Sequence, residues 1–298
     1  MTWFFFALLT ILFWSGSDLF SKIGSKPDDT YSHWKMIMAV GLVMGLHGIY
    51  MVATGTPFAF SDIITYLPAS ALYILAMIFG YVGLRYIELS VSSPICNSSG
   101  AVAAILCFLV LGQTMSGLSL FATVLICLAV VLLGVLERGQ DEEARALRRQ
   151  QAGVKYEKSI IAILFPILYC IIDGLGTFAD AFLLDVRIAE EQANIAYEFT
   201  FLFMAVCAFV YVVIIKKQKL VLWDEKPKLA AALVETAGQF TYIFAIGANA
   251  VVAAPLISSY CVFSVLWSRI FLKEKLNWKY YAVIGMAVAG IMIFGAEG

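Results

Sequence analysis

The run Val91-Ser-Ser-Pro-Ile-Cys-Asn-Ser-Ser has a counterpart 161 residues later, Val252-Ala-Ala-Pro-Leu-Ile-Ser-Ser-Tyr, and both runs continue into an apolar helix, a short polar turn and a second apolar helix. The pairs that align without a gap are Pro94 with Pro255, Ser98 with Ser259, Leu111 with Leu272, Gln113 with Glu274 and Gly134 with Gly295. Chance similarity of two apolar hairpins is the alternative, but the shared proline and the shared acid-or-amide turn favour duplication. Such duplication is typical of membrane proteins built from two structural repeats.

The composition also indicates a membrane protein. Of the 298 residues, 62% are apolar and 14% are charged, whereas a soluble domain carries about 25% charged residues. The mean hydropathy is +0.89. No Lys or Arg precedes the first apolar run, so we expect no cleaved signal peptide. The six cysteines lie in apolar segments without paired spacing, which predicts buried thiols rather than disulfides or a metal site.

Ten segments are long and apolar enough to cross a bilayer, which takes about 20 residues. Their approximate ranges are 3–23, 34–53, 64–85, 92–112, 117–136, 158–181, 194–215, 228–248, 251–272 and 278–296. A charged linker at 138–157 separates a first five-helix repeat, 1–137, from a second, 158–298. Because five is odd, the second repeat is predicted to be inverted. The expected fold is therefore an all-α integral membrane protein of ten transmembrane helices in two inverted five-helix repeats.

Basic residues in the loops predict the orientation. Nineteen of the 20 Lys and Arg residues fall in the predicted loops of one side, and the other side, which includes both termini, has only Arg187. This distribution predicts a multi-pass protein of the inner or plasma membrane with both termini outside the cytoplasm.

The chain resembles the drug/metabolite transporter (DMT) superfamily, in particular its EamA-type members. The resemblance covers the whole chain, and its most specific parts are Phe13-Trp-Ser-Gly-Ser17 and Pro255-Leu256 through Phe271-Leu-Lys-Glu-Lys-Leu276. Glu274 stands where EamA proteins usually carry a Glu, and Gln113 departs from that acid. The resemblance implies secondary active transport by alternating access. The resemblance also implies cytoplasmic termini, whereas the loop charges predict termini outside the cytoplasm. We adopt the prediction from the loop charges.

Two acids are predicted to lie near the middle of the membrane at matching positions of the two repeats. Asp18 follows Trp14 by four residues, and Asp173 follows Tyr169 by four residues. An ionisable residue inside a span is costly, and its default interpretation is functional. Both pairs are predicted to bind substrate between the repeats. The structural alternative is that each acid pairs within the bundle, for example Asp18 with Lys22.

Further polar residues are predicted in the later spans. Tyr197 and Glu198 lie together in one span, and Glu235, Gln239 and Tyr242 form a stripe along one face of the next. We expect these five residues to bind substrate, and hydrogen bonding between helices is the alternative.

His47 joins Asp173 and Glu235 as a candidate for proton coupling, because the histidine pKa lies near neutrality, although a hydrogen-bonded core histidine is the simpler interpretation. Asp180, two turns beyond Asp173 on the same face, is predicted to be exposed to water near a helix end. Gly41, Gly45 and Gly48 are predicted to let a neighbouring helix approach closely.

Acids and aromatic rings without buried Lys or Arg are what a small organic cation or amine requires. The predicted function is a secondary transporter of such a solute, which protons could drive. The alternatives are an exporter of neutral or zwitterionic amino acids or metabolites, and a lipid-linked flippase or non-transporting partner subunit. We expect no enzymatic activity, cofactor or metal, because no corresponding motif is present. The expected partners are the small-molecule substrate and the lipid bilayer, without nucleic acid, and a homodimer is compatible with the sequence.

Overall fold

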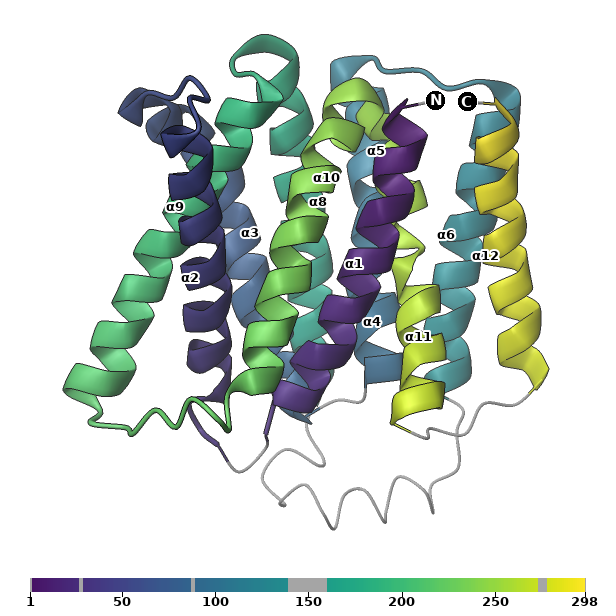
Figure 1. The fold of residues 1–298 in the computed structure, drawn as a ribbon. Coiled ribbons are helices and arrows are strands. Elements are labelled where there is room, and N and C mark those ends of the chain that lie inside the picture. The colour runs from purple at the N-terminus through teal and green to yellow at the C-terminus, as the bar shows by residue number, and fades with distance from the viewer. Residues whose placement is uncertain (1, 27–28, 87–88, 139–159, 273–277, 298) are drawn as a thin grey trace.

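The computed structural model describes residues 2–26, 29–86, 89–138, 160–272 and 278–297. Within these ranges every regular element is a helix. The helices are α1 (Thr2–Gly24), α2 (Ser32–Ala53), α3 (Phe60–Tyr86), α4 (Leu89–Asn97), α5 (Ser99–Leu111), α6 (Gly117–Arg138), α8 (Ile160–Val186), α9 (Glu190–Phe209) with a π-helical end η2 (Val210–Ile215), α10 (Lys226–Ser258), α11 (Tyr260–Phe271) and α12 (Trp278–Glu297). The helices stand side by side, with both chain ends at the same end of the bundle (Figure 1).

Seven helical segments within the described residues are long and apolar enough to cross a membrane, and Gly117–Leu133 and Trp278–Phe294 are shorter apolar helices. Large apolar side chains such as Ile64, Leu109 and Phe203 point outward. So many exposed large apolar side chains are unusual for a soluble monomer. In hydrocarbon a helix satisfies its own backbone hydrogen bonds, so these sequences form helices.

The longest of these segments, Lys226–Phe271, has 46 residues. A straight helix of that length would extend for about 69 Å, more than twice the hydrocarbon thickness. The chain bends at Asn249, whose φ of −166° and ψ of 84° are not helical. The amide of Val251, just after the bend, donates to Gln113 Oε1 at 3.2 Å. The turn amide of the first half therefore satisfies a backbone group next to the kink in the second half.

Two serines interrupt helices at the positions that align in the sequence. Ser98, between α4 and α5, has φ −62° and ψ −10°. Ser259, between α10 and α11, has φ −65° and ψ −7°. Each follows an in-helix proline, Pro94 or Pro255, by four residues. The two stretches thus share backbone geometry as well as sequence.

Helices from before the linker pack against helices from after it. The most extensive pairs are α1 with α10, α2 with α9, α3 with α8 and α6 with α12. The α2–α9 contact is close because of three glycines, as predicted: a Cβ at Gly41 would lie 2.2 Å from the Phe201 carbonyl oxygen, and one at Gly45 would lie 2.7 Å from Leu202. A Cβ at Gly48 would lie 3.1 Å from Glu198.

The structure corrects the predictions for Cys207 and Asp180, and two further predictions concern residues that it does not describe. Cys207 on α9 is exposed rather than buried, because it lies on the outward face of its helix among apolar side chains. Asp180 is wholly buried, so the prediction that water surrounds it is wrong. The linker predicted at 138–157 lies, beyond Arg138, outside the described residues, as does Glu274.

Candidate functional site

A central cavity lies between α1, α3, α4, α5, α8, α9, α10 and α11 and contains about 970 Å³ of space not filled by atoms, including its mouth. Among the residues that the structure describes, its wall holds three acids, Asp18, Asp173 and Glu235, and no Lys, Arg or His. Seven aromatic residues complete the wall: Trp14, Tyr73, Tyr81, Tyr169, Tyr197, Tyr242 and Tyr260. The cavity is therefore acidic and aromatic at once.

Serine hydroxyls hold the aspartates Asp18 and Asp173. Asp18 Oδ2 accepts hydrogen bonds from Ser93 at 2.5 Å and Ser264 at 2.7 Å. Asp173 Oδ2 accepts one from Ser99 at 2.7 Å. Ser93 and Ser99 flank the interruption at Ser98, so the broken helix delivers a hydroxyl to each acid. Asp18 is thus held from α4 and α11, and the Lys22 ammonium, considered above as a local partner, donates to the Leu84 carbonyl oxygen at 2.9 Å.

The polar stripe of α10 faces the same cavity. Glu235, Gln239 and Tyr242 all line it, because residues four and three apart share a helix face. Glu235 interacts electrostatically with both Asp18 and Asp173. Three acids without a basic neighbour form an electronegative cavity that favours a positive charge.

The indole of Trp14 forms one aromatic wall. Its ring lies 4.8 Å from Tyr242 and 5.7 Å from Tyr260, measured between centroids. Glycines make room for the aromatic residue that precedes each aspartate. A Cβ at Gly238 would lie 2.3 Å from Trp14, and one at Gly80 would lie 2.9 Å from Tyr169. Each ring therefore packs on a glycine of the opposite half.

Three hydrogen-bond donors in the cavity wall have no partner. They are Trp14 Nε1, the Tyr81 hydroxyl and Gln239 Nε2, all inaccessible to solvent. An unpaired buried donor costs about 1–3 kcal/mol. Because these three atoms are inaccessible in this conformation, their side chains must turn toward the cavity before an acceptor oxygen of a ligand can satisfy them.

The structure gathers most of the residues predicted to bind substrate. Eight of the nine line the cavity: Trp14, Asp18, Tyr169, Asp173, Tyr197, Glu235, Gln239 and Tyr242. Glu198 is absent from the lining because it points from α9 toward α2. There it lies 2.7 Å from His47 Nδ1 and accepts a hydrogen bond from Asn194 at 3.0 Å. The acid and the histidine predicted for separate roles are thus one another's partners.

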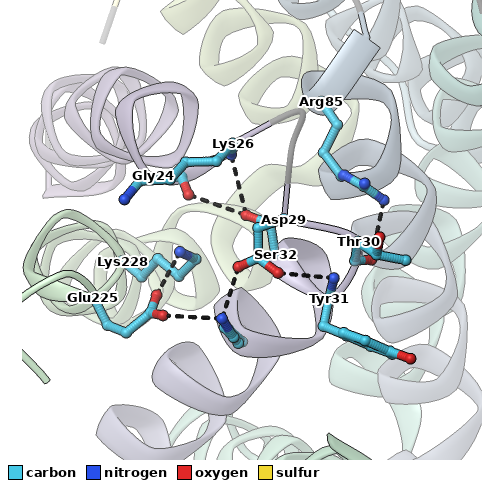
Figure 2. Close-up of polar contacts among 10 residues, drawn as sticks. Gly24, Lys26, Asp29, Thr30, Tyr31, Ser32, Arg85, Glu225 and Lys228 are labelled. Atoms are coloured by element: carbon cyan, nitrogen blue, oxygen red, sulfur yellow. Dashed lines mark hydrogen bonds and ion pairs between the residues drawn. The ribbon is translucent and has the colours of Figure 1, made fainter. Parts of the chain in front are cut away.

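A charged cluster at the opposite end of the bundle from the termini connects the segment between α1 and α2 with α2, α3 and the start of α10 (Figure 2). Lys35 contacts Asp29 at 2.8 Å and Glu225 at 3.3 Å, and Glu225 also pairs with the buried Lys228. Arg85 donates to the Thr30 carbonyl at 3.1 Å. Burial alone would raise the pKa of Asp29, but hydrogen bonds from Lys35 and the Tyr31 amide and the charges of Lys35 and Lys228 together hold that pKa below its ordinary value.

Comparison with known proteins identifies the family. The profile of the EamA-like transporter family matches residues 1–135 and 160–296. A solved crystal structure titled only as that of a protein is 15% identical, covers 98% of this chain and 96% of its own, and superposes with a TM-score of 0.69. At that identity it shows the fold alone. No curated protein sequence matches the chain.

Proposed function

The chain belongs to the EamA-like transporter family, and from this premise we propose that it carries a small organic cation or amine through its central cavity. It is an integral, multi-pass membrane protein and a transporter of small solutes. Asp18, Asp173 and Glu235 would compensate the charge of the substrate, and the cavity tyrosines and Trp14 would surround it. The observation that carries the proposal is that the described wall of this aromatic cavity has three acids and no base.

Two physical arguments support an organic cation. Contact between a desolvated cation and an aromatic face contributes roughly 0.5 to 2 kcal/mol, and Trp14, Tyr242 and Tyr260 form such a surface. In the described part of the chain no three His, Cys, Asp or Glu side chains are grouped closely enough to hold a metal ion. The acids are therefore suited to a charge spread over a molecule larger than a metal ion.

The unpartnered donors support a second candidate, a zwitterion such as a neutral amino acid. Its ammonium group would face the acids, and its carboxylate would accept from Trp14 Nε1, Tyr81 and Gln239 Nε2 once these buried donors turn toward the cavity. A quaternary ammonium ion has no acceptor for these donors.

We also propose that transport proceeds by alternating access between two inverted five-helix halves. The kink at Asn249 would divide the 46-residue segment into two crossings. If the two halves are equivalent, α1 corresponds to α8, and α3 corresponds to the first part of α10. The packing of α1 on α10 then has its counterpart in the packing of α8 on α3, and both pairs are extensive. The similar φ and ψ angles of Ser98 and Ser259 agree with this correspondence between the halves. The loop charges favour termini outside the cytoplasm, which reporter tags on the termini and linker would test.

Protons are the proposed driving ion, with Asp173, Glu235 and the His47–Glu198 pair as candidate carriers. An acid that the substrate does not neutralise can bind a proton in the alternate state. Transport by Asp173→Asn, Glu235→Gln and His47→Ala variants in vesicles with and without a pH gradient would distinguish these groups.

The deciding experiment measures thermal stabilisation of the purified protein by matched ligands. A ligand at 100 times its Kd stabilises the folded state by about 2.7 kcal/mol. The panel pairs each amino acid with the amine that lacks its carboxylate, and includes quaternary ammonium ions, polyamines, sugars and sugar phosphates. If amines stabilise as well as amino acids, the cation is the substrate; if only amino acids do, the zwitterion is. Stabilisation by sugar phosphates alone would refute both.

The variants give the control for this experiment. Asp173→Asn combined with Glu235→Gln removes two charges from the cavity and should abolish the response. Asp185→Asn, on the same helix as Asp173 but exposed, removes a charge away from the cavity and should leave it intact. A full response in the double variant would exclude the acids as binding groups.

A further inference from the structure

A further buried acid lies behind the wall of the cavity. Asp180 on α8 is fully buried and does not line the cavity. Its Oδ1 accepts a hydrogen bond from Tyr66 at 2.6 Å, and its Oδ2 accepts one from Tyr73 at 3.4 Å. In the part of the chain that the structure describes, no ion pair is formed by Asp180. A carboxylate without a basic partner is costly to bury as an anion.

The neighbours of Asp180 are hydroxyls and a thiol. From α3 come Tyr66 and Tyr73, from α10 Tyr242 acts on the network through Tyr73, and from α5 the Cys107 thiol lies within electrostatic reach. No Lys, Arg or His is among these groups. Protonation would remove the uncompensated charge and give the carboxyl group a hydrogen to donate.

Tyr73 connects this acid to the cavity. Its hydroxyl lies 2.6 Å from the hydroxyl of Tyr242 and 3.2 Å from Thr177 Oγ1 as well as 3.4 Å from Asp180. A phenol has one proton to donate, so Tyr73 cannot donate to all three. Tyr242 in turn lines the cavity and packs against Trp14. The direction of donation between Tyr73 and Tyr242 therefore depends on whether Asp180 requires the Tyr73 proton.

We propose that Asp180 is a proton-binding site of this protein and that Tyr73 transmits its protonation state to the cavity at Tyr242. When Asp180 is ionised, it only accepts, so Tyr73 donates to Asp180 and Tyr242 donates to Tyr73. When a proton from water forms the O–H bond on Asp180, the acid donates to Tyr73, and Tyr73 donates to Tyr242. The Tyr242 proton then turns toward Thr177 or a bound ligand. No covalent bond breaks in the protein, and the added proton stays on Asp180.

The consequence for transport rests on the proposed function, because it couples substrate binding at Tyr242 to a proton held outside the substrate site. A dedicated proton site differs from competition for one acid, since substrate and proton can then be bound together. The two donation patterns are two discrete arrangements of one hydrogen-bond network, as coupling between two sites requires.

The test uses infrared difference spectroscopy of the full-length protein in lipid bilayers, titrated with acid and without any substrate. The wild type should show carbonyl stretches of protonated buried carboxyl groups, and Asp180→Asn should lose the one component that Asp180 contributes while those of the other buried acids remain. Asp185→Asn, the exposed acid on the same helix, should keep it. In Tyr66→Phe, which removes the 2.6 Å donor to Asp180, the band should move to higher frequency. A band that is unchanged in Asp180→Asn and in Tyr66→Phe would overturn the proton site. If Asp180→Asn does not fold, Tyr66→Phe decides alone.

The coupling step has its own readout. Tyr73→Phe removes the hydroxyl between Asp180 and Tyr242 but leaves the acid. It should keep the carboxyl band and lose the pH-dependent change of the tyrosine phenol bands. Persistence of that change would overturn the transmission through Tyr73. Since no substrate is used, these outcomes are independent of whether the protein binds cations, zwitterions or neither.

Discussion

Replacing Gly41 by alanine tests the close approach of α2 and α9 most directly. The added Cβ would lie 2.2 Å from the carbonyl oxygen of Phe201 and 2.7 Å from the Cβ of Ala205. An ordinary contact is at least 3.4 Å, so the two helices must separate by more than 1 Å at this point. The obstructing oxygen belongs to a helical backbone and cannot swing aside as a flexible side chain could.

The magnitude follows from two opposing effects. Overpacking a close contact costs about 1–3 kcal/mol, and alanine is favoured over glycine within a helix by about 1 kcal/mol. Because the clash is with backbone, we expect the upper part of the first range and a net loss of about 1–2 kcal/mol. Gly285 in α12 is the matched control: a Cβ there meets no atom within 4 Å, so Gly285→Ala should be neutral or stabilising.

Thermal unfolding of the three proteins in one detergent, at one heating rate, measures the difference. A change of 1 kcal/mol corresponds to about 2–4 °C in Tm for a large domain. We expect Gly41→Ala to unfold several degrees below the wild type and Gly285→Ala at or above it. If Gly41→Ala unfolds with the wild type, α2 and α9 do not approach as closely as described, and the His47–Glu198 contact between them is also in doubt.

Three further predictions concern the cavity and the charged groups. Gly238→Ala would place a Cβ 2.3 Å from Trp14 and displace the indole. Stabilisation by tetraethylammonium should then need about 2- to 30-fold more ligand, because the cation–aromatic contact is lost. An unaltered dose response in the thermal-shift assay would contradict the role of Trp14. Asp29→Asn should be less stable than the wild type above about pH 4, where unfolded Asp ionises. Since the pKa of Asp29 in the folded protein is lowered, this difference in stability should disappear as the pH falls through that lowered pKa. A difference that stays constant across a pH series of unfolding curves would refute the assignment. His47→Ala leaves the buried Glu198 carboxylate without its 2.7 Å partner and should cost about 1–3 kcal/mol, which Glu198→Gln in the same chain should partly restore; unfolding of the single and double variants decides this.

Local sequence was sufficient for the elements that depend on hydropathy. A run of about 20 apolar residues forms a helix in a bilayer because no other structure satisfies its backbone there. Pro94 and Pro255 mark both interrupted stretches in the sequence, since a proline removes a backbone donor, but the breaks at Ser98 and Ser259 lie four residues after them. The matching positions of Asp18 and Asp173, and the stripe of Glu235, Gln239 and Tyr242, could also be read from spacing alone.

Only the tertiary structure determined which polar side chains meet. Asp180 lies seven residues after Asp173 and Tyr73 seven after Tyr66, spacings that place each pair on one helix face, but only the packing of α3 on α8 brings the tyrosines to the acid. Glu198 follows a cavity residue directly, and yet it turns toward His47. In a membrane the lipid-facing and helix-facing surfaces are both apolar, so hydropathy does not distinguish them. The rotation of each helix about its axis, and with it the membership of the cavity, depends on contacts such as those of Gly41 and Gly238.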